Sequence, residues 1–192
     1  MKKISKIIIL VIIIAISIII TNLITQKIIT NNINKKSAEI TTAKNMYIKL
    51  QTRQNYEKII INEIYFKDNI ILINNYENNI LQTTDWKNTI TGEKISYIYT
   101  LDEGILESNS FNDTLIEKIK SVVSIDNSNT SFLKKENNNY VYKMQDIFKK
   151  YYNSENYSLE KITCEEPFLE ETYIFKFNTV TEEDVLKPSK DL

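Results

Sequence analysis

The densest group of side chains that could do chemistry is a set of four acidic residues near the carboxyl end. Its members are Glu165, Glu166, Glu170 and Glu171. Carboxylate oxygens of this kind can bind calcium. The group lacks the alternating acidic loop with a central glycine that calcium sites use, and Pro167 and Phe168 divide it into two pairs. We therefore interpret it as a solvated loop and predict no metal site.

A second acidic group surrounds Gly104 and has the residue types of a hydrolase. Asp102, Glu103 and Glu107 could pair as general acid and base in glycoside hydrolysis, which uses two carboxylates. Such chemistry needs a cleft in which one carboxyl has a raised pKa, and no sequence pattern indicates one. A hydrolase without histidine that uses Asp102 and Glu107 is kept as an alternative hypothesis.

The residue types that are missing exclude most other catalytic machinery. The chain has 192 residues with no histidine, one cysteine and two glycines, so no imidazole can act as base or ligand. Cys164 alone cannot form an internal disulfide or a cysteine-pair zinc site, and we expect it to be buried on a strand. Gly92 and Gly104 are too far apart for a phosphate-binding loop. We predict no catalytic, cofactor-binding or metal-binding residues, and a protein that is not an enzyme.

An apolar segment at the amino end has the length and composition of a membrane span. Ile7 to Gln26 is 20 residues without a charge. At about 1.5 Å per residue, such a helix covers the roughly 30 Å hydrocarbon core of a bilayer. A cleaved secretory signal has a shorter apolar core and a small-x-small cleavage site, which does not follow here. We predict an uncleaved, single-pass anchor that contacts the lipid bilayer through Ile7 to Gln26.

The charges that flank this segment predict the side of the membrane on which each end lies. Lys2, Lys3 and Lys6 precede the span, whereas Lys27 is the one basic residue among the eight that follow it. Because positive charge tends to stay on the cytoplasmic side, we expect a cytoplasmic amino end and an extracytoplasmic carboxyl-terminal domain at the cell membrane. Residues 28–192 carry 20 basic and 25 acidic side chains, which argues against a nucleic-acid partner.

The segment that follows the span has the pattern of an amphipathic helix. No Gly or Pro occurs in residues 34–58. Apolar side chains repeat there at spacings of three and four, at Ile40, Ala43, Tyr47 and Leu50. This stripe is either a stalk or packing seam for neighbours, or a helix that covers one side of the chain's own sheet, and we favour the second. The asparagines at positions 31, 32 and 34 either break the helix or leave the span and the stripe as one rod of about 50 residues.

From Ile59 onward, β-branched and aromatic residues in short runs predict strands over 59–66, 69–74 and 79–82. The clearest unit is a hairpin over 94–108, in which the segment Asp102-Glu103-Gly104 supplies the turn. Two further strands are predicted over 157–164 and 172–180. In the second of them Tyr173, Phe175 and Phe177 share a face.

Two short helices are predicted between and beside these strands. Asn112 or Asp113 can cap the first, whose apolar face comprises Leu115, Ile116, Ile119 and Val122 or Val123. A polar loop is expected over 126–130. Tyr140 to Tyr152 has apolar residues at helical spacing and predicts the second helix. Its apolar residues either belong to the core or form a binding face, and we favour the core. The acidic tail from Thr181 is expected to fray.

Together these elements predict an α+β fold in four parts. They are a transmembrane anchor over 1–27, an amphipathic helix or stalk over 28–58, an extracytoplasmic α+β domain over 59–180, and an acidic tail over 181–192. The expected architecture is a single amino-terminal transmembrane helix that extends into an amphipathic helix, then a small antiparallel sheet with one or two short helices.

The order of these parts resembles the minor pilins and pseudopilins of type IV pilus, type II secretion and competence systems. Gly92 to Asp126, which reads GEKISYIYTLDEGILESNSFNDTLIEKIKSVVSID, is similar to a segment of some minor pseudopilins in which a tyrosine-bearing strand turns at a glycine into a second strand. The family's processing site places a small residue, usually Gly, before the apolar helix and a Glu five residues into it. This chain has Lys6 before Ile7 and no acid before Glu39, so we predict an unprocessed amino terminus.

These features predict a non-enzymatic, membrane-anchored protein that faces outward and works by protein contact, as a component of a pilus-like or secretion assembly. Its partners would then be proteins of a membrane or surface assembly. One alternative is an anchored accessory subunit of a conjugation or secretion channel, with several short helices on one curved sheet that resemble the nuclear-transport-factor fold in outline. Another is an anchored ligand-binding or sensor domain.

Overall fold

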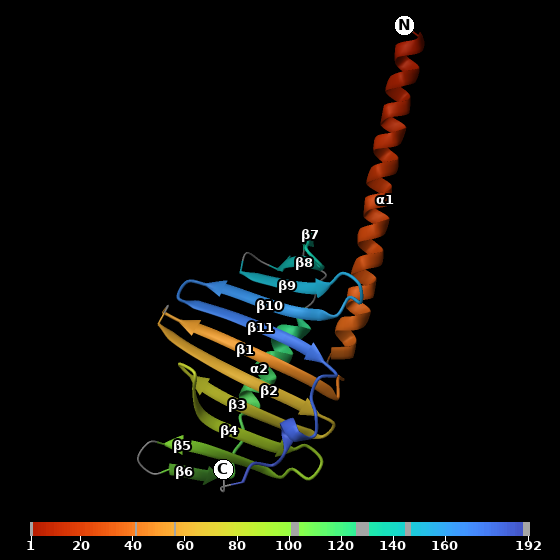
Figure 1. The fold of residues 1–192 in the computed structure, drawn as a ribbon. Helices are drawn as coiled ribbons and strands as arrows, with labels where there is room; N and C mark the ends of the chain where they lie inside the picture. Colours follow the sequence, from red (N-terminus) through yellow and green to blue (C-terminus); the bar gives the residue numbers. More distant parts are fainter. Residues whose placement is uncertain are drawn as a thin grey trace.

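A long amino-terminal helix leads into a broad antiparallel sheet (Figure 1). The computed structural model describes residues 2–40, 42–55, 57–100, 104–125, 131–144 and 147–189. Helix α1 (Lys2–Ile40) is 39 residues long, and the asparagines at positions 31, 32 and 34 do not break it. It ends at Ile40, and the backbone N–H groups of Thr42 and Ala43 then donate to the carbonyls of Glu39 and Ile40.

The first part of α1 projects away from the domain with its apolar side chains exposed. Every residue from Ile7 to Ile28 is exposed. The hydroxyls of Ser17 and Thr21 donate to carbonyls one turn earlier in the helix, at 2.9 and 2.8 Å, so the helix itself satisfies both groups. Within the described part of the chain, α1 is the one helix that is long and apolar enough to cross a membrane.

The last turns of α1 pack onto the domain. Ile29, Ile33 and Ile40 belong to the main hydrophobic core, and Ile33 is completely buried. The hydroxyls of Thr30 and Tyr142 share a hydrogen bond of 3.0 Å. The exposed and the packed parts of α1 are thus turns of one continuous helix.

The helix expected to continue to residue 58 is wrong beyond Ile40, because β1 (Asn45–Gln54) is a strand. Met46, Ile48, Leu50 and Thr52 are buried, whereas the residues between them are only partly buried. This period of two competes with the three-and-four spacing of Tyr47 and Leu50, which lie on opposite faces of the strand. Pairing with a strand on each side decides the outcome in favour of the strand.

One antiparallel sheet of eleven strands is described, which is larger than the small sheet expected. Its remaining strands are β2 (Lys58–Lys67), β3 (Ile70–Glu77), β4 (Ile80–Asn88), β5 (Lys94–Thr100), β6 (Gly104–Ser108), β7 (Ser131–Glu136), β8 (Asn139–Met144), β9 (Phe148–Asn153), β10 (Leu159–Glu166) and β11 (Leu169–Phe177). The spatial order is β6-β5-β4-β3-β2-β1-β11-β10-β9-β8-β7.

This order places β1 at the centre and β6 and β7 at the two edges. The chain runs from β1 to the β6 edge, crosses one face through α2 (Asp113–Ser124), and then returns strand by strand from the β7 edge (Figure 1). In the central register, Ile48 lies opposite Ile64 on one side and Phe175 on the other. The hairpin predicted over 94–108 is confirmed as β5 and β6, and Gly104 has a φ of +76°, whereas Asp102 and Glu103 lie outside the described residues.

Helix α2 has the cap and the apolar face that the sequence predicts. The Asn112 side chain accepts a hydrogen bond from the Leu115 N–H at 3.1 Å. The buried residues are Leu115, Ile116, Ile119, Val122 and Val123. At the other end, the buried Lys150 ammonium donates to the carbonyls of Val123 and Ile125 at 3.0 and 2.8 Å. A cation therefore sits where the helix dipole is negative and satisfies carbonyls that the helix leaves without partners.

The helix predicted over 140–152 is wrong, because this segment forms β8 and β9. Tyr140 pairs directly with Tyr152, and Tyr142 with Lys150. Apolar side chains at helical spacing also fit a strand whose two faces are both covered, so this spacing does not distinguish a helix from strands here. The polar loop expected over 126–130 lies outside the described residues. The strands predicted over 157–164 and 172–180 are confirmed, with shifted ends, as β10 and β11.

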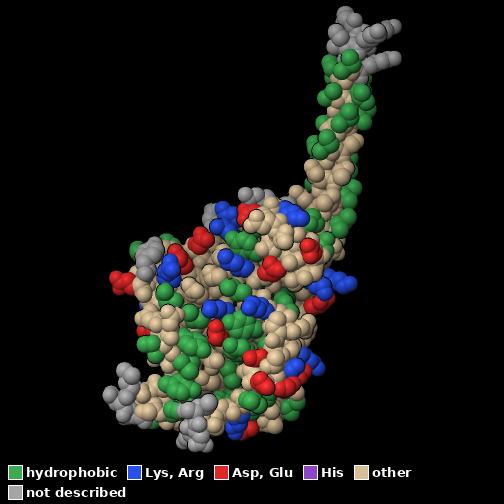
Figure 2. All heavy atoms as spheres, viewed as in Figure 1, with side chains coloured by type: hydrophobic (Ala, Val, Ile, Leu, Met, Phe, Trp, Pro, Cys, Tyr) green, Lys and Arg blue, Asp and Glu red, His purple; other side chains and the backbone are tan. Residues whose placement is uncertain are grey.

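Two hydrophobic cores lie on the two faces of the sheet. The main core joins α2 and the end of α1 to one face of the sheet. The second core, which includes Leu72, Trp86 and Tyr97, lies on the other face beneath the carboxyl-terminal segment. That segment was expected to fray, but Val180 and Val185 are buried and residues 183–185 form a short 3₁₀ helix, η2 (Glu183–Val185). Figure 2 shows this second face, with apolar side chains between the charged ones.

Candidate functional site

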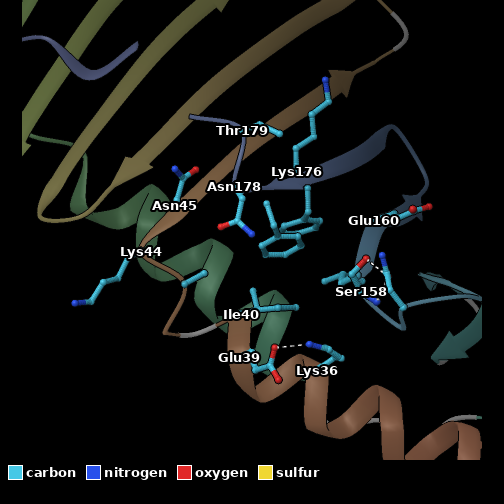
Figure 3. Close-up of a pocket in the computed structure, with 15 residues that line it drawn as sticks. Lys36, Glu39, Ile40, Lys44, Asn45, Ser158, Glu160, Lys176, Asn178 and Thr179 are labelled. Atoms are coloured by element: carbon cyan, nitrogen blue, oxygen red, sulfur yellow. Dashed lines mark hydrogen bonds and ion pairs between the residues drawn. The ribbon is translucent and has the colours of Figure 1, made fainter. Parts of the chain in front are cut away.

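A groove lies where the end of α1 meets the sheet (Figure 3). Its volume is about 610 Å³, within the range of ligand-binding clefts. Its walls come from the last turn of α1, the start of β1, the start of β10 and the end of β11. Segments far apart in the sequence are therefore brought together here.

The floor of the groove is apolar. Phe175 and Phe177 lie two residues apart on β11, so alternation directs both side chains to the face that carries α2. Ile40 at the end of α1 and Leu159 at the start of β10 complete the floor, and both are buried in the main core. The groove therefore opens onto the edge of the main core.

The rim of the groove is charged and nearly balanced. Lys36 and Glu39 form an ion pair of 2.8 Å across one turn of α1. On the opposite rim, the Glu160 carboxylate accepts a hydrogen bond of 2.8 Å from the Asn153 amide. Lys44 and Lys176 add two further cations. Lys36, Glu39, Lys44 and Lys176 are exposed, and exposed charges of this kind contribute little to stability.

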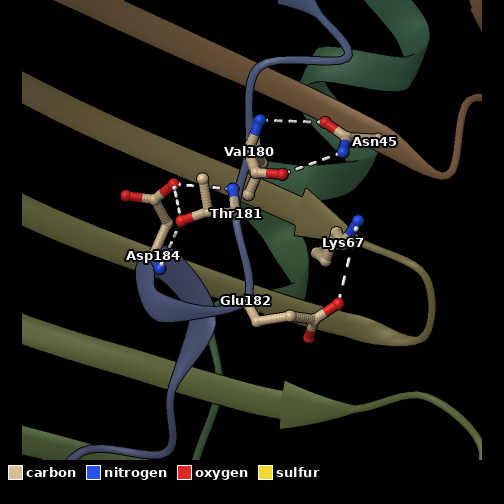
Figure 4. A network of polar contacts seen from close by, with 6 residues as sticks. All are labelled: Asn45, Lys67, Val180, Thr181, Glu182 and Asp184. Atoms are coloured by element: carbon tan, nitrogen blue, oxygen red, sulfur yellow. Dashed lines mark hydrogen bonds and ion pairs between the residues drawn. The ribbon is translucent and has the colours of Figure 1, made fainter.

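Asn45 fixes the groove to the carboxyl-terminal segment (Figure 4). Its amide donates to the Val180 carbonyl and accepts from the Val180 N–H, both at 2.9 Å. The Asn45 carbonyl also accepts from the Asn178 N–H at 3.1 Å. These three hydrogen bonds imitate one further step of strand pairing beyond the end of β11.

The carboxyl-terminal segment then continues across the second face of the sheet. The Thr181 N–H and hydroxyl donate to the Asp184 carboxylate at 2.7 and 2.8 Å, which starts η2 (Figure 4). The Trp86 indole N–H donates to the Val185 carbonyl at 3.0 Å. Lys187 contacts both the Trp86 ring and the Glu93 carboxylate. The segment is thus a structural strap, and nothing in its contacts requires a ligand.

The acidic group of the β10–β11 turn does not assemble into a metal site. Glu165, Glu166 and Glu170 are exposed, whereas Glu171 is buried on the face that carries α2. Glu171 accepts hydrogen bonds from the Lys118 ammonium and, at 2.8 Å, from the Tyr173 hydroxyl. Among the described residues, no three acidic or thiol side chains could hold a metal ion together.

The acidic group of the β5–β6 hairpin is only partly described. Glu107 is exposed on β6 and lines a polar hollow of about 450 Å³ together with Glu93 and Lys187. Because Lys187 binds the Glu93 carboxylate at 2.5 Å, this carboxylate is held as the partner of a cation. Asp102, the other member of the proposed catalytic pair, lies outside the described residues.

Asp85, Tyr47 and Tyr65 have raised pKa values, lie away from the groove and form hydrogen bonds with neighbouring side chains. Burial on the face that carries α2 raises the pKa of Asp85. The Asp85 carboxylate accepts hydrogen bonds from the Ser96 hydroxyl and the Asn75 amide. Burial, and then the Glu63 carboxylate, raise the pKa of Tyr47 and Tyr65, whose hydroxyls donate to Glu63 at 3.1 and 3.3 Å. These tyrosines stay protonated and act as hydrogen-bond donors rather than as bases.

Cys164 is buried on β10, as the sequence predicts. Burial, followed by the nearby Glu166 carboxylate, raises the pKa of its thiol. Because the thiolate is the reactive form, this environment makes the thiol a poor nucleophile.

The groove itself could not be predicted from the sequence. Ile40 was expected in a longer helix, and Asn45 carried no signal because the chain is rich in asparagine. The alternation of Tyr173, Phe175 and Phe177 was recognised, but it does not indicate which element covers that face. The pairing of β11 with β1 on one side and with β10 on the other brings the strand walls together.

Comparison with known proteins gives no family. No protein-family model and no curated protein sequence matches the chain. Among solved structures, the chain is similar to an uncharacterized conserved protein from Thermus thermophilus. The alignment covers 87% of this chain and 96% of that one, with a TM-score of 0.42 and 10% sequence identity. A likeness at this level carries no argument about function.

Proposed function

We propose that this protein is a single-pass, membrane-anchored domain that lies outside the cytoplasm and works by protein contact rather than by catalysis. The observation that carries the proposal is the continuity of α1. Its exposed, charge-free turns from Ile7 to Gln26 suit a bilayer, and the same helix is locked into the main core at Ile33. A span joined to a domain in this way holds the domain at a fixed height and orientation above the membrane.

In this proposal the groove at the end of α1 is the contact site. Its apolar floor and its charged rim fit an extended protein segment that inserts one large apolar side chain between Ile40 and Phe175. Central apolar pockets of this kind supply most of the energy in protein interfaces, and a polar rim adds specificity.

Cysteine accessibility tests the topology. In a Cys164→Ser background, a membrane-impermeant maleimide is expected to label Asn109→Cys in intact cells, because Asn109 is exposed beyond β6. Ser5→Cys, before the span, is expected to react only after the membrane is permeabilised. Labelling of both positions only after permeabilisation would contradict the outward orientation.

Photo-crosslinking tests the contact site. A photoreactive amino acid at Lys44, on the rim of the groove, is expected to give a discrete crosslinked product in native membranes. The matched control is Lys94, an exposed lysine on β5. Equal crosslinking from Lys44 and Lys94 would contradict a contact site in the groove.

The pilus-like or secretion assembly is the setting that we propose for this contact, on the strength of the sequence resemblance. The amino-terminal sequence of protein extracted from native membranes tests it. Loss of the residues before Ile7, with a modified new terminus, would support maturation as a pilin. We expect a chain that keeps Met1, because Lys6 stands where pilins have a small residue; this result would contradict ordinary pilin maturation and favour a permanently anchored accessory subunit.

A further inference from the structure

The contacts of α1 define how the sheet is oriented relative to the span. Thr30 contacts Tyr142 on β8, and ten residues later Ile40 lines the groove beside Phe175 on β11. Ten helical residues rise about 15 Å. The three strand spacings from β8 to β11 amount to about 14 Å. The strand order therefore runs parallel to the axis of α1, as Figure 1 also shows.

This alignment places the β7 edge of the sheet at the level of the membrane surface. Thr30 lies four residues, or about 6 Å along the axis, beyond Gln26, where the charge-free span ends. Strand β7 lies one spacing of about 5 Å beyond β8 in the direction of the span, which is level with Lys27. The headgroup layer of a bilayer leaflet is about 5 to 7 Å thick, so β7 and β8 lie within its depth.

Positive charge is concentrated at the end of this axis nearest the span, as docking on an anionic surface requires. Strands β7, β8 and β9 carry five lysines against one Glu, and one of these lysines, Lys150, is buried against the end of α2. Strands β4, β5 and β6 at the far edge carry two lysines against two acidic residues. In α1 itself, residues 27–36 hold three lysines and no acid. The strands nearest the span are thus basic, whereas the strands at the far edge are balanced in charge.

Side chains at the near edge have the character of a membrane interface. Lys135 on β7 is exposed, and its ammonium lies 5.8 Å from the centre of the Tyr140 ring. Tyr140 in turn stacks on Tyr157 at 6.0 Å. Tyrosine and lysine are the residues that anchor proteins at the level of the headgroups.

We infer that the β7–β8 edge of the sheet docks on the bilayer surface through lysine contacts with anionic lipid phosphates. The inference rests on the proposed function, because it requires α1 to span the membrane. Docking would cover the backbone groups of edge strand β7, which otherwise form a template for pairing with other chains. It would also hold the sheet upright. The groove at Ile40 would then lie about 15 Å farther from the membrane than Thr30, which is the rise of ten helical residues.

Fluorescence quenching in reconstituted bilayers tests the inference on the full chain. The protein, in a Cys164→Ser background, carries a fluorophore at Asn138→Cys in the β7–β8 turn or at Asn109→Cys at the far edge. The vesicles contain either phosphatidylcholine alone or phosphatidylcholine with phosphatidylglycerol, each with a quencher attached to the headgroup. We expect strong quenching at Asn138 in anionic vesicles and none above background at Asn109.

Charge reversal supplies the matched comparison. Lys135→Glu is expected to lose most of the quenching at Asn138, whereas Lys94→Glu, the same change at the far edge, is expected to retain it. The comparison of the two lipid compositions needs no variant, so it stands even if Lys135→Glu folds poorly. Flotation of the same samples reports whether the chain is inserted at all.

Each outcome decides between the claims. Inserted protein with an unquenched Asn138 label would overturn the docking inference and leave the anchor intact. Equal quenching in neutral and anionic vesicles would overturn the role of the lysines. Protein that fails to float with vesicles would overturn the proposed anchor itself.

Discussion

The most informative perturbation is the removal of the side chain that locks α1 to the domain. Ile33 is completely buried in the main core, between the span and the groove. Ile33→Ala removes three carbon atoms, which at about 0.8 kcal/mol each corresponds to roughly 2.4 kcal/mol of lost burial. The cavity left behind raises the expected loss to about 3 to 4 kcal/mol.

The matched control is the same substitution five residues earlier. Ile28 is 54% exposed, so Ile28→Ala is expected to change the free energy of unfolding by less than about 0.5 kcal/mol. Both variants can be compared by urea unfolding in detergent micelles, with Trp86 fluorescence as the probe because this side chain is buried in the second core. If Ile33→Ala and Ile28→Ala unfolded at the same urea concentration, the end of α1 would not be an integral part of the core.

Three further substitutions test individual contacts. Lys150→Met is expected to destabilise the domain by about 2 to 3 kcal/mol in urea unfolding, because it removes the ammonium that binds two carbonyls at the end of α2. Lys149→Met, at a half-buried neighbour, is expected to cost far less. Equal losses of stability would refute the capping role of Lys150. Asn45→Ala is expected to speed hydrogen exchange in residues 180–186, and unchanged exchange would contradict its role in holding the strap. Because burial raises the pKa of Asp85, its contribution to stability is full below its ordinary value of 3.8 and is lost as the pH rises through the raised value. Asp85→Asn is therefore expected to gain stability relative to the unmodified protein as the pH rises from 3 to 7. If the two proteins differed by the same free energy of unfolding at every pH in that range, the raised pKa of Asp85 would be refuted.

Elements that depend on local signals were predictable from the sequence. The cap of α2 at Asn112 and the hairpin that returns at Gly104 each follow from a few adjacent residues. The apolar run of α1 is equally local. In each case the residues that determine the element are the residues that form it.

Elements decided by distant partners were not predictable. The segment around Tyr47 and Leu50 fits a helix by spacing, and it becomes a strand because β2 and β11 supply hydrogen bonds on both sides. The burial of Val185 depends on Trp86, which lies 99 residues away in the chain, so the tail alone reads as a polar end. The groove forms where α1 ends and where β1 pairs with β11. No local pattern in the sequence encodes that pairing.

Alkaline extraction of native membranes tests the central claim, that α1 anchors the domain, most directly. The full chain is expected to remain in the membrane pellet at its full-length mass. A variant with Ile12→Lys and Ile16→Lys is expected to be released, because each charge at the centre of a span costs about 2.5 to 3.5 kcal/mol. Ile28→Lys, beyond the end of the charge-free segment, is expected to stay in the pellet. Release of the unmodified chain, or its recovery as a shortened soluble protein, would contradict the account.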